Sequence, residues 1–200
     1  MNYASCQVRK DILGDIMENK LPNRKDLRLK DYDYSQAGYY FVTICTGNKE
    51  RILCDIVGDA VVGNAVVGDA ALSVPQLATV QAKLTQTGYI VEQHLKNINV
   101  VYPNAKLDCY VVMPNHVHFI VIIEDAPPQE VEGRLRAAAP TSLPKIINSF
   151  KTITSKKYGK TLWQRNYYEH VIRKDKELHE IREYIVNNPA KWELDKYFNS

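Results

Sequence analysis

The sequence predicts an α+β domain, in which antiparallel strands are covered by helices. Residues 39–45 (YYFVTIC) are aromatic and β-branched, which is typical of a strand. Residues 106–113 and 116–123 are two more strand-like runs joined by a Pro-Asn corner, which indicates an antiparallel hairpin. Three other stretches carry apolar residues at helical spacing, over about 76–98, 143–157 and 175–187.

The first strand leads into a region of turns and low complexity. A turn at 46–49 follows it, and we expect a second strand at 51–54 to return beside the first. Residues 57–71 then repeat a five-residue unit three times (VGDAV, VGNAV, VGDAA). Three units are too few for a solenoid, and glycine at every fifth position suits neither a helix nor a core strand. We interpret this repeat as an insertion in a surface loop.

The three helical stretches are expected to pack on the sheet. The first is long and amphipathic, and Gly88 is the expected position of a kink. The second is basic, and its predicted buried side consists of Ile146, Ile147, Phe150 and Ile153. Residues 167–172 are expected to be extended, and Asp175 is expected to cap the third helix. Because Asn188 precedes a proline, we expect this helix to end at about Asn187.

These elements define one domain over 36–192. Residues 1–35 are polar and irregular, so they are expected to form an N-terminal extension. Residues 124–140 (EDAPPQEVEGRLRAAAP) are expected to be a flexible linker, and 193–200 a C-terminal tail. A chain of 200 residues is long enough to bury a sizeable core without disulfides or a structural metal.

The composition favours a cytoplasmic globular protein. Hydrophobic residues make up 45% and charged residues 24%, which excludes a disordered or collagen-like chain. No apolar run approaches the roughly 18 residues of a membrane span, and the N-terminus lacks the apolar region of a signal peptide. The four cysteines are scattered without a C-x-x-C pair, so we expect reduced thiols.

Positive charge is concentrated in one part of the chain. The formal net charge is only +3, but the segment 145–176 contains nine Lys and Arg residues against two acidic ones. This segment therefore carries +7, and the rest of the chain is net acidic. Two interpretations stay open from charge alone, namely a solvated helix face and a surface that contacts nucleic acid.

The pattern His116-Val117-His118 lies inside a predicted strand. Alternate residues of a strand emerge on the same face, about 6.6 Å apart along it, so the two imidazoles can share one metal ion. Val117 and Phe119 lie on the other face of the strand, which leaves the histidines as polar exceptions on a face shared with Ile120. A pair of ordinary hydrogen-bonded histidines is the alternative interpretation.

A third partner can be sought on the final helix. Tyr184 and Asn188 are four residues apart, which stacks them on one helix face with Cβ atoms about 5–6 Å apart. Ile181 and Ile185 lie near the same face, so it points toward the sheet. A tyrosine of the apolar core is the alternative interpretation for Tyr184.

Three motifs in this order carry a resemblance to a known family. They are M-P-N-H-V-H-F-I-V-I (113–122), W-Q-R-N-Y-Y-E-H-V-I-R (163–173) and Y-I-V-N-N-P (184–189). Together they resemble the REP-associated tyrosine transposases, a branch of the single-tyrosine HUH insertion-sequence transposases. The resemblance covers about 38–192, apart from the 57–71 repeat and the 124–140 linker. It implies a ferredoxin-like antiparallel sheet with helices packed on its faces.

The resemblance also implies a chemistry. It assigns His116, His118 and Asn188 as ligands of a divalent metal, Mg²⁺ or Mn²⁺, and Tyr184 as the nucleophile. A phenol with a pKa near 10 needs a cation to form the phenolate and to neutralise a phosphodiester. The implied enzyme is a metal-dependent endonuclease and strand transferase, which nicks and rejoins single-stranded DNA at hairpin or palindromic repeats through a 5′-phosphotyrosine.

The basic segment then acquires a role in DNA binding, because Lys and Arg contact phosphates and aromatic rings stack on unpaired bases. The residues expected to contact DNA are Lys145, Lys151, Lys156, Lys157, Trp163, Arg165, Tyr167 and Arg173. His170 is expected to be structural. Two alternative functions stay open: an HUH relaxase or replication-initiator nickase, and a DNA-binding regulator without cleavage activity. The sequence predicts no membrane partner and leaves both a homodimer and a monomer open.

Overall fold

The computed structural model describes residues 32–58, 80–125, 129–131, 134–136 and 141–198. The chain divides into two compact units, 1–33 and 34–200, and the sheet and helices that the structure describes belong to the second. Most of the expected N-terminal extension and of the 57–71 repeat therefore lie outside the described residues. Among those described, no helix has the length and apolar character needed to cross a membrane. Cys45, Cys54 and Cys109 are free thiols.

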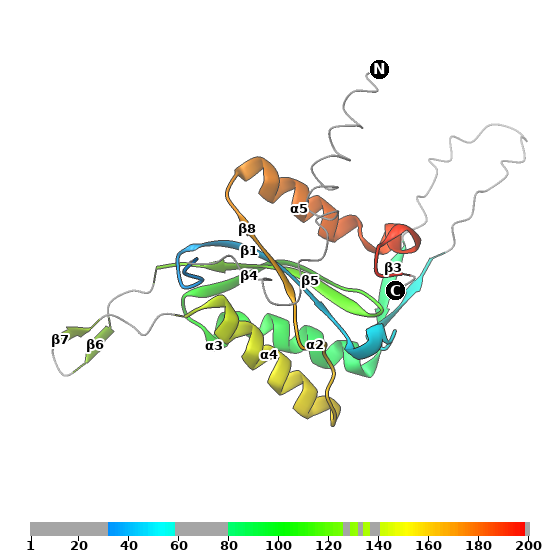
Figure 1. Ribbon diagram of the computed structural model, residues 1–200, viewed down its shortest axis with the longest axis horizontal. Helices are drawn as coiled ribbons and strands as arrows, with labels where there is room; N and C mark the ends of the chain where they lie inside the picture. Colours follow the sequence, from blue (N-terminus) through cyan, green and yellow to red (C-terminus); the bar gives the residue numbers. More distant parts are fainter. Residues whose placement is uncertain (1–31, 59–79, 126–128, 132–133, 137–140, 199–200) are drawn as a thin grey trace, which may run out of the picture. The chain divides into compact units, whose positions relative to one another are not determined.

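The second unit is built on a four-stranded antiparallel sheet (Figure 1). Its strands are β1 (Gly38–Cys45), β4 (Ala105–Val112), β5 (His116–Ile123) and β8 (Tyr168–Ile172), in the order β4-β5-β1-β8. The two central strands are β5 and β1, and the hairpin predicted over 106–123 forms the β4–β5 pair. This strand order, with helices in the β1–β4 and β5–β8 connections, is that of a ferredoxin-like fold. The predicted α+β class is confirmed.

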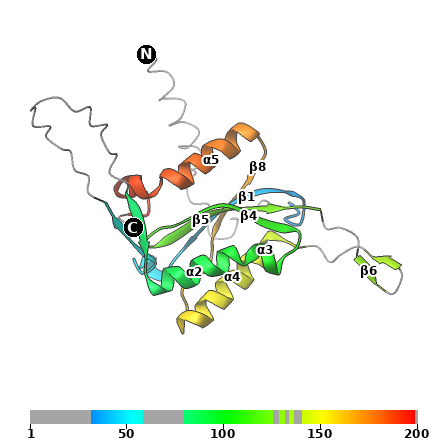
Figure 2. The ribbon, with the colours of Figure 1, turned by 180° about the vertical axis from the view of Figure 1, so that it is seen from behind.

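Helices cover both faces of the sheet. On one face lie α2 (Gln86–Lys96), α3 (Ile98–Val101) and α4 (Leu143–Tyr158), and on the other lies α5 (Asp175–Asn187), as Figures 1 and 2 show from opposite sides. The short helix η2 (Pro189–Leu194) follows α5. A ferredoxin-like fold places its two crossover helices on one face. The helix α5 therefore covers a face that these helices leave open.

An apolar cluster joins α5 to the sheet. The buried residues of this cluster are Phe41, Ile120 and Ile172 of the strands and Leu178, Ile181 and Ile185 of α5. The alternate strand residues Tyr40, Val42 and Phe119 are also buried, because they face the other helix layer. Both sides of the sheet are therefore apolar, as expected for a sheet covered on two faces.

Two polar contacts hold α5 on either side of its apolar stripe. The β4 strand has a register shift between Leu107 and Tyr110, the position of a β-bulge. Within it, Asp108 accepts two hydrogen bonds from the Arg182 guanidinium of α5, at 2.7 and 2.8 Å. On the other side, Glu177 of α5 contacts His170 Nε2 of β8 at 2.8 Å. The structural role expected for His170 agrees with this contact.

The strand expected at 51–54 beside β1 is a wrong prediction. The structure has β2 (Cys54–Val57), which pairs with β3 (Gln81–Leu84) in a separate two-stranded sheet. Both edges of β1 are already paired, one with β5 and the other with β8. No hydrogen-bonding edge of β1 is left for a returning strand.

The start of the first predicted helix is also wrong, because Gln81–Leu84 is β3 and the helix begins at Gln86. Thr85 ends the strand and caps the helix, accepting a hydrogen bond from the Gly88 backbone N–H. Gly88 does not mark a kink in the middle of the helix. It lies in the first turn, where a Cβ would collide with the backbone oxygen of Leu53. Glycine is therefore needed for the close approach of two backbones.

The basic helix is confirmed as α4, and Ile146, Ile147 and Phe150 are buried as predicted. Ile153 is a correction, because it is 41% exposed, and Thr154 is buried in its place. Thr154 Oγ1 donates to the Phe150 carbonyl oxygen and accepts from an indole N–H, so its hydroxyl is satisfied inside the core.

The last helix is confirmed over Asp175–Asn187, but its predicted cap is wrong. Lys174 occupies the N-cap position without a side-chain cap, and the Glu177 carboxylate accepts the Arg173 backbone N–H at 3.1 Å. Asn188 keeps an α conformation despite the following proline, and the chain continues directly into η2. Within the expected linker, β6 (Gln129–Val131) and β7 (Arg134–Arg136) pair as a hairpin.

Candidate active site

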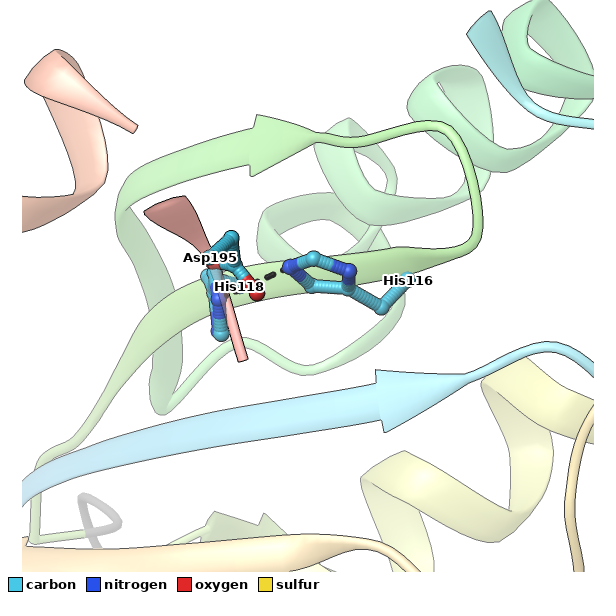
Figure 3. Close-up of side chains that lie close together, drawn as sticks. All are labelled: His116, His118 and Asp195. Atoms are coloured by element: carbon cyan, nitrogen blue, oxygen red, sulfur yellow. Dashed lines mark hydrogen bonds between the residues drawn. The ribbon is translucent and has the colours of Figure 1, made fainter. Parts of the chain in front are cut away.

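The two histidines of the predicted metal pair meet on the face of the sheet covered by α5. His116 and His118 are the first and third residues of β5, so both side chains point to this face. Both are fully buried, and their Nε2 atoms lie 2.9 Å apart (Figure 3). The strand geometry inferred from the sequence therefore brings the two imidazoles into direct contact.

Partners on the Nδ1 atoms fix the orientation of both rings. His116 Nδ1 lies 2.8 Å from Asn115 Oδ1, and the Asn115 amide nitrogen donates to the Tyr197 carbonyl oxygen at 2.8 Å. The amide oxygen must therefore face the imidazole, so Nδ1 of His116 carries the proton and its Nε2 carries a lone pair. His118 Nδ1 lies 2.7 Å from Thr43 Oγ1, opposite it in the β1–β5 register. A proton or a cation is needed between the two Nε2 atoms.

Burial keeps both imidazoles neutral. It lowers the pKa of His116 to about 3 and that of His118 well below its usual value, and the positive charge of Lys196 adds to both shifts. A neutral imidazole with its Nδ1 bound to a neighbouring oxygen is the form that binds a metal ion.

Tyr184 reaches this pair from α5. Its hydroxyl lies 3.2 Å from His118 Nε2 and 3.5 Å from a carboxylate oxygen of Asp195. The ring packs against the imidazole of His118, with centroids 5.2 Å apart, and edge-on against Phe41. Burial, followed by the charge of Asp195, raises the pKa of Tyr184 well above its ordinary value. The hydroxyl is therefore held protonated beside the histidine.

Asn188 lies one helical turn after Tyr184, as the four-residue spacing predicted. Its side chain is buried, with 3% exposed. Burial raises the pKa of both Tyr184 and Asp195, and hydrogen bonds from Asn188 oppose this rise. Its amide oxygen has no hydrogen-bond partner among the described residues. A buried carbonyl oxygen without a donor is suited to a cation.

Asp195 is a site residue that the sequence analysis missed. Its carboxylate belongs to a group with His116 and His118 in which the three ligand atoms lie within 4.8 Å of one another (Figure 3). A hydrogen bond from the nearby backbone fixes the orientation of this carboxylate, because it accepts the backbone N–H of Tyr197 at 2.7 Å. No periodicity or spacing marks this position, since the residue follows the short helix η2. The only local signal is an Asp two residues before the N–H that it binds.

Aromatic side chains of the same C-terminal segment cover the histidines. The ring of Tyr197 lies 4.5 Å from that of His116, and the ring of Trp192 lies 6.0 Å from it. The rings of Trp192 and Phe198 contact each other at 5.2 Å. Residues 192–198 thus contribute one wall of the site.

This set of donors fits a divalent metal ion. Imidazole nitrogen, carboxylate oxygen and carboxamide oxygen are ligands of Mn²⁺ and of related ions, and oxygen ligands also suit Mg²⁺. His116, His118 and Asp195 could bind one ion, and the oxygen of Asn188, to which no residue of the described part of the chain donates, offers a fourth donor.

Two of the residues expected to contact DNA are instead used within the fold. Trp163 is 3% exposed, packs against Phe150 at 5.6 Å and donates its indole N–H to Thr154. Its ring therefore has no free face for a base in this structure. Lys151 donates to two backbone oxygens, those of Gln164 and Arg165, at 2.6 and 2.8 Å.

The other residues expected to contact DNA are accessible and form two groups outside the histidine pair. Lys145, Lys156 and Lys157 are exposed on α4, which lies on the opposite face of the sheet from α5 (Figure 1). The remaining three flank the edge strand β8: Arg165 and Tyr167 before it, and Arg173 after it.

Comparisons with known proteins identify the family of this site. The family described as "Transposase IS200 like" matches residues 85–188, just over half of the chain. The chain therefore belongs to the IS200-like transposases, which are DNA-cleaving enzymes that generally use a divalent metal.

Individual relatives agree with this assignment. An uncharacterised protein of Haemophilus influenzae is 34% identical over 196 residues, covering 88% of this chain and 93% of its own length. Another protein of that organism, which carries the name of a REP-associated tyrosine transposase, is 29% identical over 82 residues, 40% of this chain and 47% of its own. A solved REP-associated tyrosine transposase, bound to a REP hairpin, has a similar fold, with a TM-score of 0.52 and 17% identity. The match covers 84% of this chain and 76% of that one. The resemblance inferred from the three motifs is confirmed.

Proposed function

We propose that the protein nicks and rejoins single-stranded DNA at hairpin or palindromic repeats, through a covalent bond between Tyr184 and a 5′ phosphate. The observation that carries this proposal is the 3.2 Å contact between the Tyr184 hydroxyl and Nε2 of His118, within a buried pair of neutral imidazoles. A tyrosine that served only the apolar core would not need its hydroxyl at such a pair.

The proposed metal ligands are His116, His118 and Asn188, together with the carboxylate of Asp195. Both imidazoles are neutral at physiological pH, so no proton has to leave them before an ion binds. When bound, a divalent ion such as Mg²⁺ or Mn²⁺ neutralises charge on a phosphodiester and on the tyrosine oxygen. The high pKa of Tyr184 keeps its hydroxyl neutral in the free protein.

The proposed reaction exchanges one phosphoester bond for another. The Tyr184 oxygen loses its proton and forms a bond to phosphorus, while the bond from phosphorus to the 3′ oxygen breaks and that oxygen takes a proton. The 5′ end stays on the protein, and a second 3′-OH can reverse the step and join strands. The number of phosphoester bonds is conserved, so no ATP is required.

The proposed DNA contacts fall outside the histidine pair. Lys145, Lys156 and Lys157 of α4, with Arg165, Tyr167 and Arg173 beside the edge strand β8, are accessible to phosphates or bases. The solved relative of similar fold is bound to a REP hairpin, which supports a hairpin as the substrate of this chain. We place the reaction in the cytoplasm, in line with the free cysteines.

A covalent-adduct assay tests the proposal. Hairpin DNA with single-stranded flanks, labelled at its 3′ end, is incubated with Mn²⁺ and analysed on a denaturing protein gel. The wild type should carry the label, and Tyr184→Phe should not. Tyr197→Phe is the matched control, because this phenol also lies near the histidines but has no proposed role in the reaction. An adduct that survives in Tyr184→Phe refutes the nucleophile assignment.

The same assay separates the alternative functions. Wild-type protein that binds the hairpin tightly but forms no adduct with any divalent ion would indicate a DNA-binding regulator. Adduct formation on a linear single strand, without a need for the hairpin, would indicate a relaxase or initiator nickase.

A further inference from the structure

Two lysines from distant parts of the chain lie near the ring of Tyr197, which packs beside the histidine pair. The Lys49 ammonium lies 5.7 Å from the centroid of the Tyr197 ring, and the Lys196 ammonium lies 4.9 Å from it. The same ring lies 4.5 Å from that of His116 and 6.1 Å from that of His118. Positive charge is therefore concentrated beside the site.

The position of Lys49 is imposed by an unusual turn. Lys49 and Asn48 have φ values of 55° and 51°, in the left-handed region that residues other than glycine rarely adopt. Buried Thr46 holds this turn, since its carbonyl oxygen accepts the Lys49 backbone N–H and its hydroxyl donates to the carbonyl oxygen of Asn115. Strained backbone that its surroundings hold in place is common at functional sites. Here it ties Lys49 to the residue before His116.

The ammonium end of Lys196 lies between two aromatic rings. It is 5.7 Å from the centroid of Tyr168 and 4.9 Å from that of Tyr197. The residue is exposed, so a phosphate group from solution can reach it.

We propose that Lys49 and Lys196 bind the phosphodiester groups of the single-stranded flank that enters the active site. This inference rests on the proposed function and adds the residues that hold the strand at the point of cleavage. Lysine is suited to this role as a compact point charge for phosphate oxygens. We call Lys49 and Lys196 the lysine clamp. It is separate from the α4 lysines, which lie on the other face of the sheet.

The inference predicts an effect on the flank alone. Binding of a hairpin with a single-stranded flank is measured by fluorescence anisotropy over a range of salt concentrations, without metal so that no strand is cut. Each single variant, Lys49→Gln or Lys196→Gln, should reduce the slope of log K against log salt by about 0.7, and the double variant by about twice that. For a blunt hairpin without the flank, all slopes should equal the wild-type slope. The arginine variants Lys49→Arg and Lys196→Arg should keep the wild-type slope.

Lys106→Gln is the matched control. Lys106 is exposed and pairs with Glu124 at 2.6 Å, and it lies opposite Ile122, about 20 Å along β5 from His116. For Lys106→Gln, the slope of log K against log salt should equal that of the wild type on both DNAs. An unchanged slope in the double variant overturns the clamp, and so does a reduction that is equal for both DNAs, since the lysines would then contact the stem.

Two further measurements distinguish the failure of the clamp from that of the proposed function. Calorimetric titration with Mn²⁺ should give at least the wild-type affinity in both glutamine variants, because neither lysine is a proposed ligand and each substitution removes a positive charge beside the site. With metal present, the double variant should form the covalent adduct at least about 10-fold more slowly. A wild type that forms no adduct refutes the proposed reaction, whereas the metal-free salt slopes still decide the clamp.

Discussion

Thr43→Val should weaken the binding of metal by the histidine pair while it leaves the ligands in place. Thr43 is 2% exposed, and its hydroxyl oxygen lies 2.7 Å from Nδ1 of His118. Valine has nearly the same shape but no hydroxyl, so the Nδ1 proton needed when Nε2 binds a metal would be buried without an acceptor. Loss of such a partner typically reduces metal affinity by about 10- to 100-fold, or about 1.4 to 2.7 kcal/mol. Isothermal calorimetry with Mn²⁺ measures this loss directly.

Thr154→Val is the control for this prediction. Thr154 is equally buried, and its hydroxyl oxygen accepts the Trp163 indole N–H at 2.7 Å in the other helix layer. Each substitution leaves a buried ring nitrogen without its hydrogen-bond partner, so each should destabilise the fold by about 1 to 3 kcal/mol in urea denaturation. Only Thr43→Val should change the affinity for Mn²⁺. Wild-type Mn²⁺ affinity in Thr43→Val would refute the orienting role of this hydroxyl.

Three more substitutions test other parts of the structure. Trp163→Phe should lower the free energy of unfolding by about 1 to 3 kcal/mol and leave DNA affinity unchanged, because the indole is buried; weaker DNA binding at full stability would contradict this. Replacing Lys156 and Lys157 with alanine should reduce the salt dependence of DNA binding by about 0.7 per lost contact with a single strand, and an unchanged slope would mean that this helix face is only solvated. Gly88→Ala should destabilise the protein in urea, even though alanine favours a helix by about 1 kcal/mol, because the new Cβ would collide with the Leu53 carbonyl oxygen; a more stable variant would contradict that close approach.

The parts of the fold predicted from the sequence are those with a strong local pattern. The hairpin over 106–123 and the helices over 143–157 and 175–187 each have a regular apolar period. The pairing of β2 could not be found in this way, because the free edge of a strand is decided by elements far along the chain. Thr85 shows the same limit, since its hydroxyl both caps α2 and donates to backbone oxygens of the 51–54 region.

The candidate site was predictable in part for the same reason. His116 and His118 follow from the alternation of a strand, and Tyr184 and Asn188 from the turn of a helix. Asp195 has no such neighbour in sequence, and its place at the histidines depends on the path of the chain after α5. The burial of Trp163 was not predicted, because its position in a basic segment concealed that the indole packs in the core.

The two polar contacts of α5 fix the rotation of this helix about its own axis. Arg182 and Glu177 are five residues apart, about 140° around the helix, so their contacts with Asp108 and His170 lie on opposite flanks of the apolar stripe. An apolar stripe tolerates a small roll of the helix, but a roll of about 20° would move a hydroxyl about 8 Å from the axis by about 3 Å. That displacement is about as large as the 3.2 Å distance between the Tyr184 hydroxyl and Nε2 of His118. Partly exposed ion pairs contribute little to stability. Variants of Asp108 or Arg182 would thus fold normally, but the Tyr184 hydroxyl would no longer be aligned with His118. Their lower activity would show that a rotation of α5 affects the reaction from a distance.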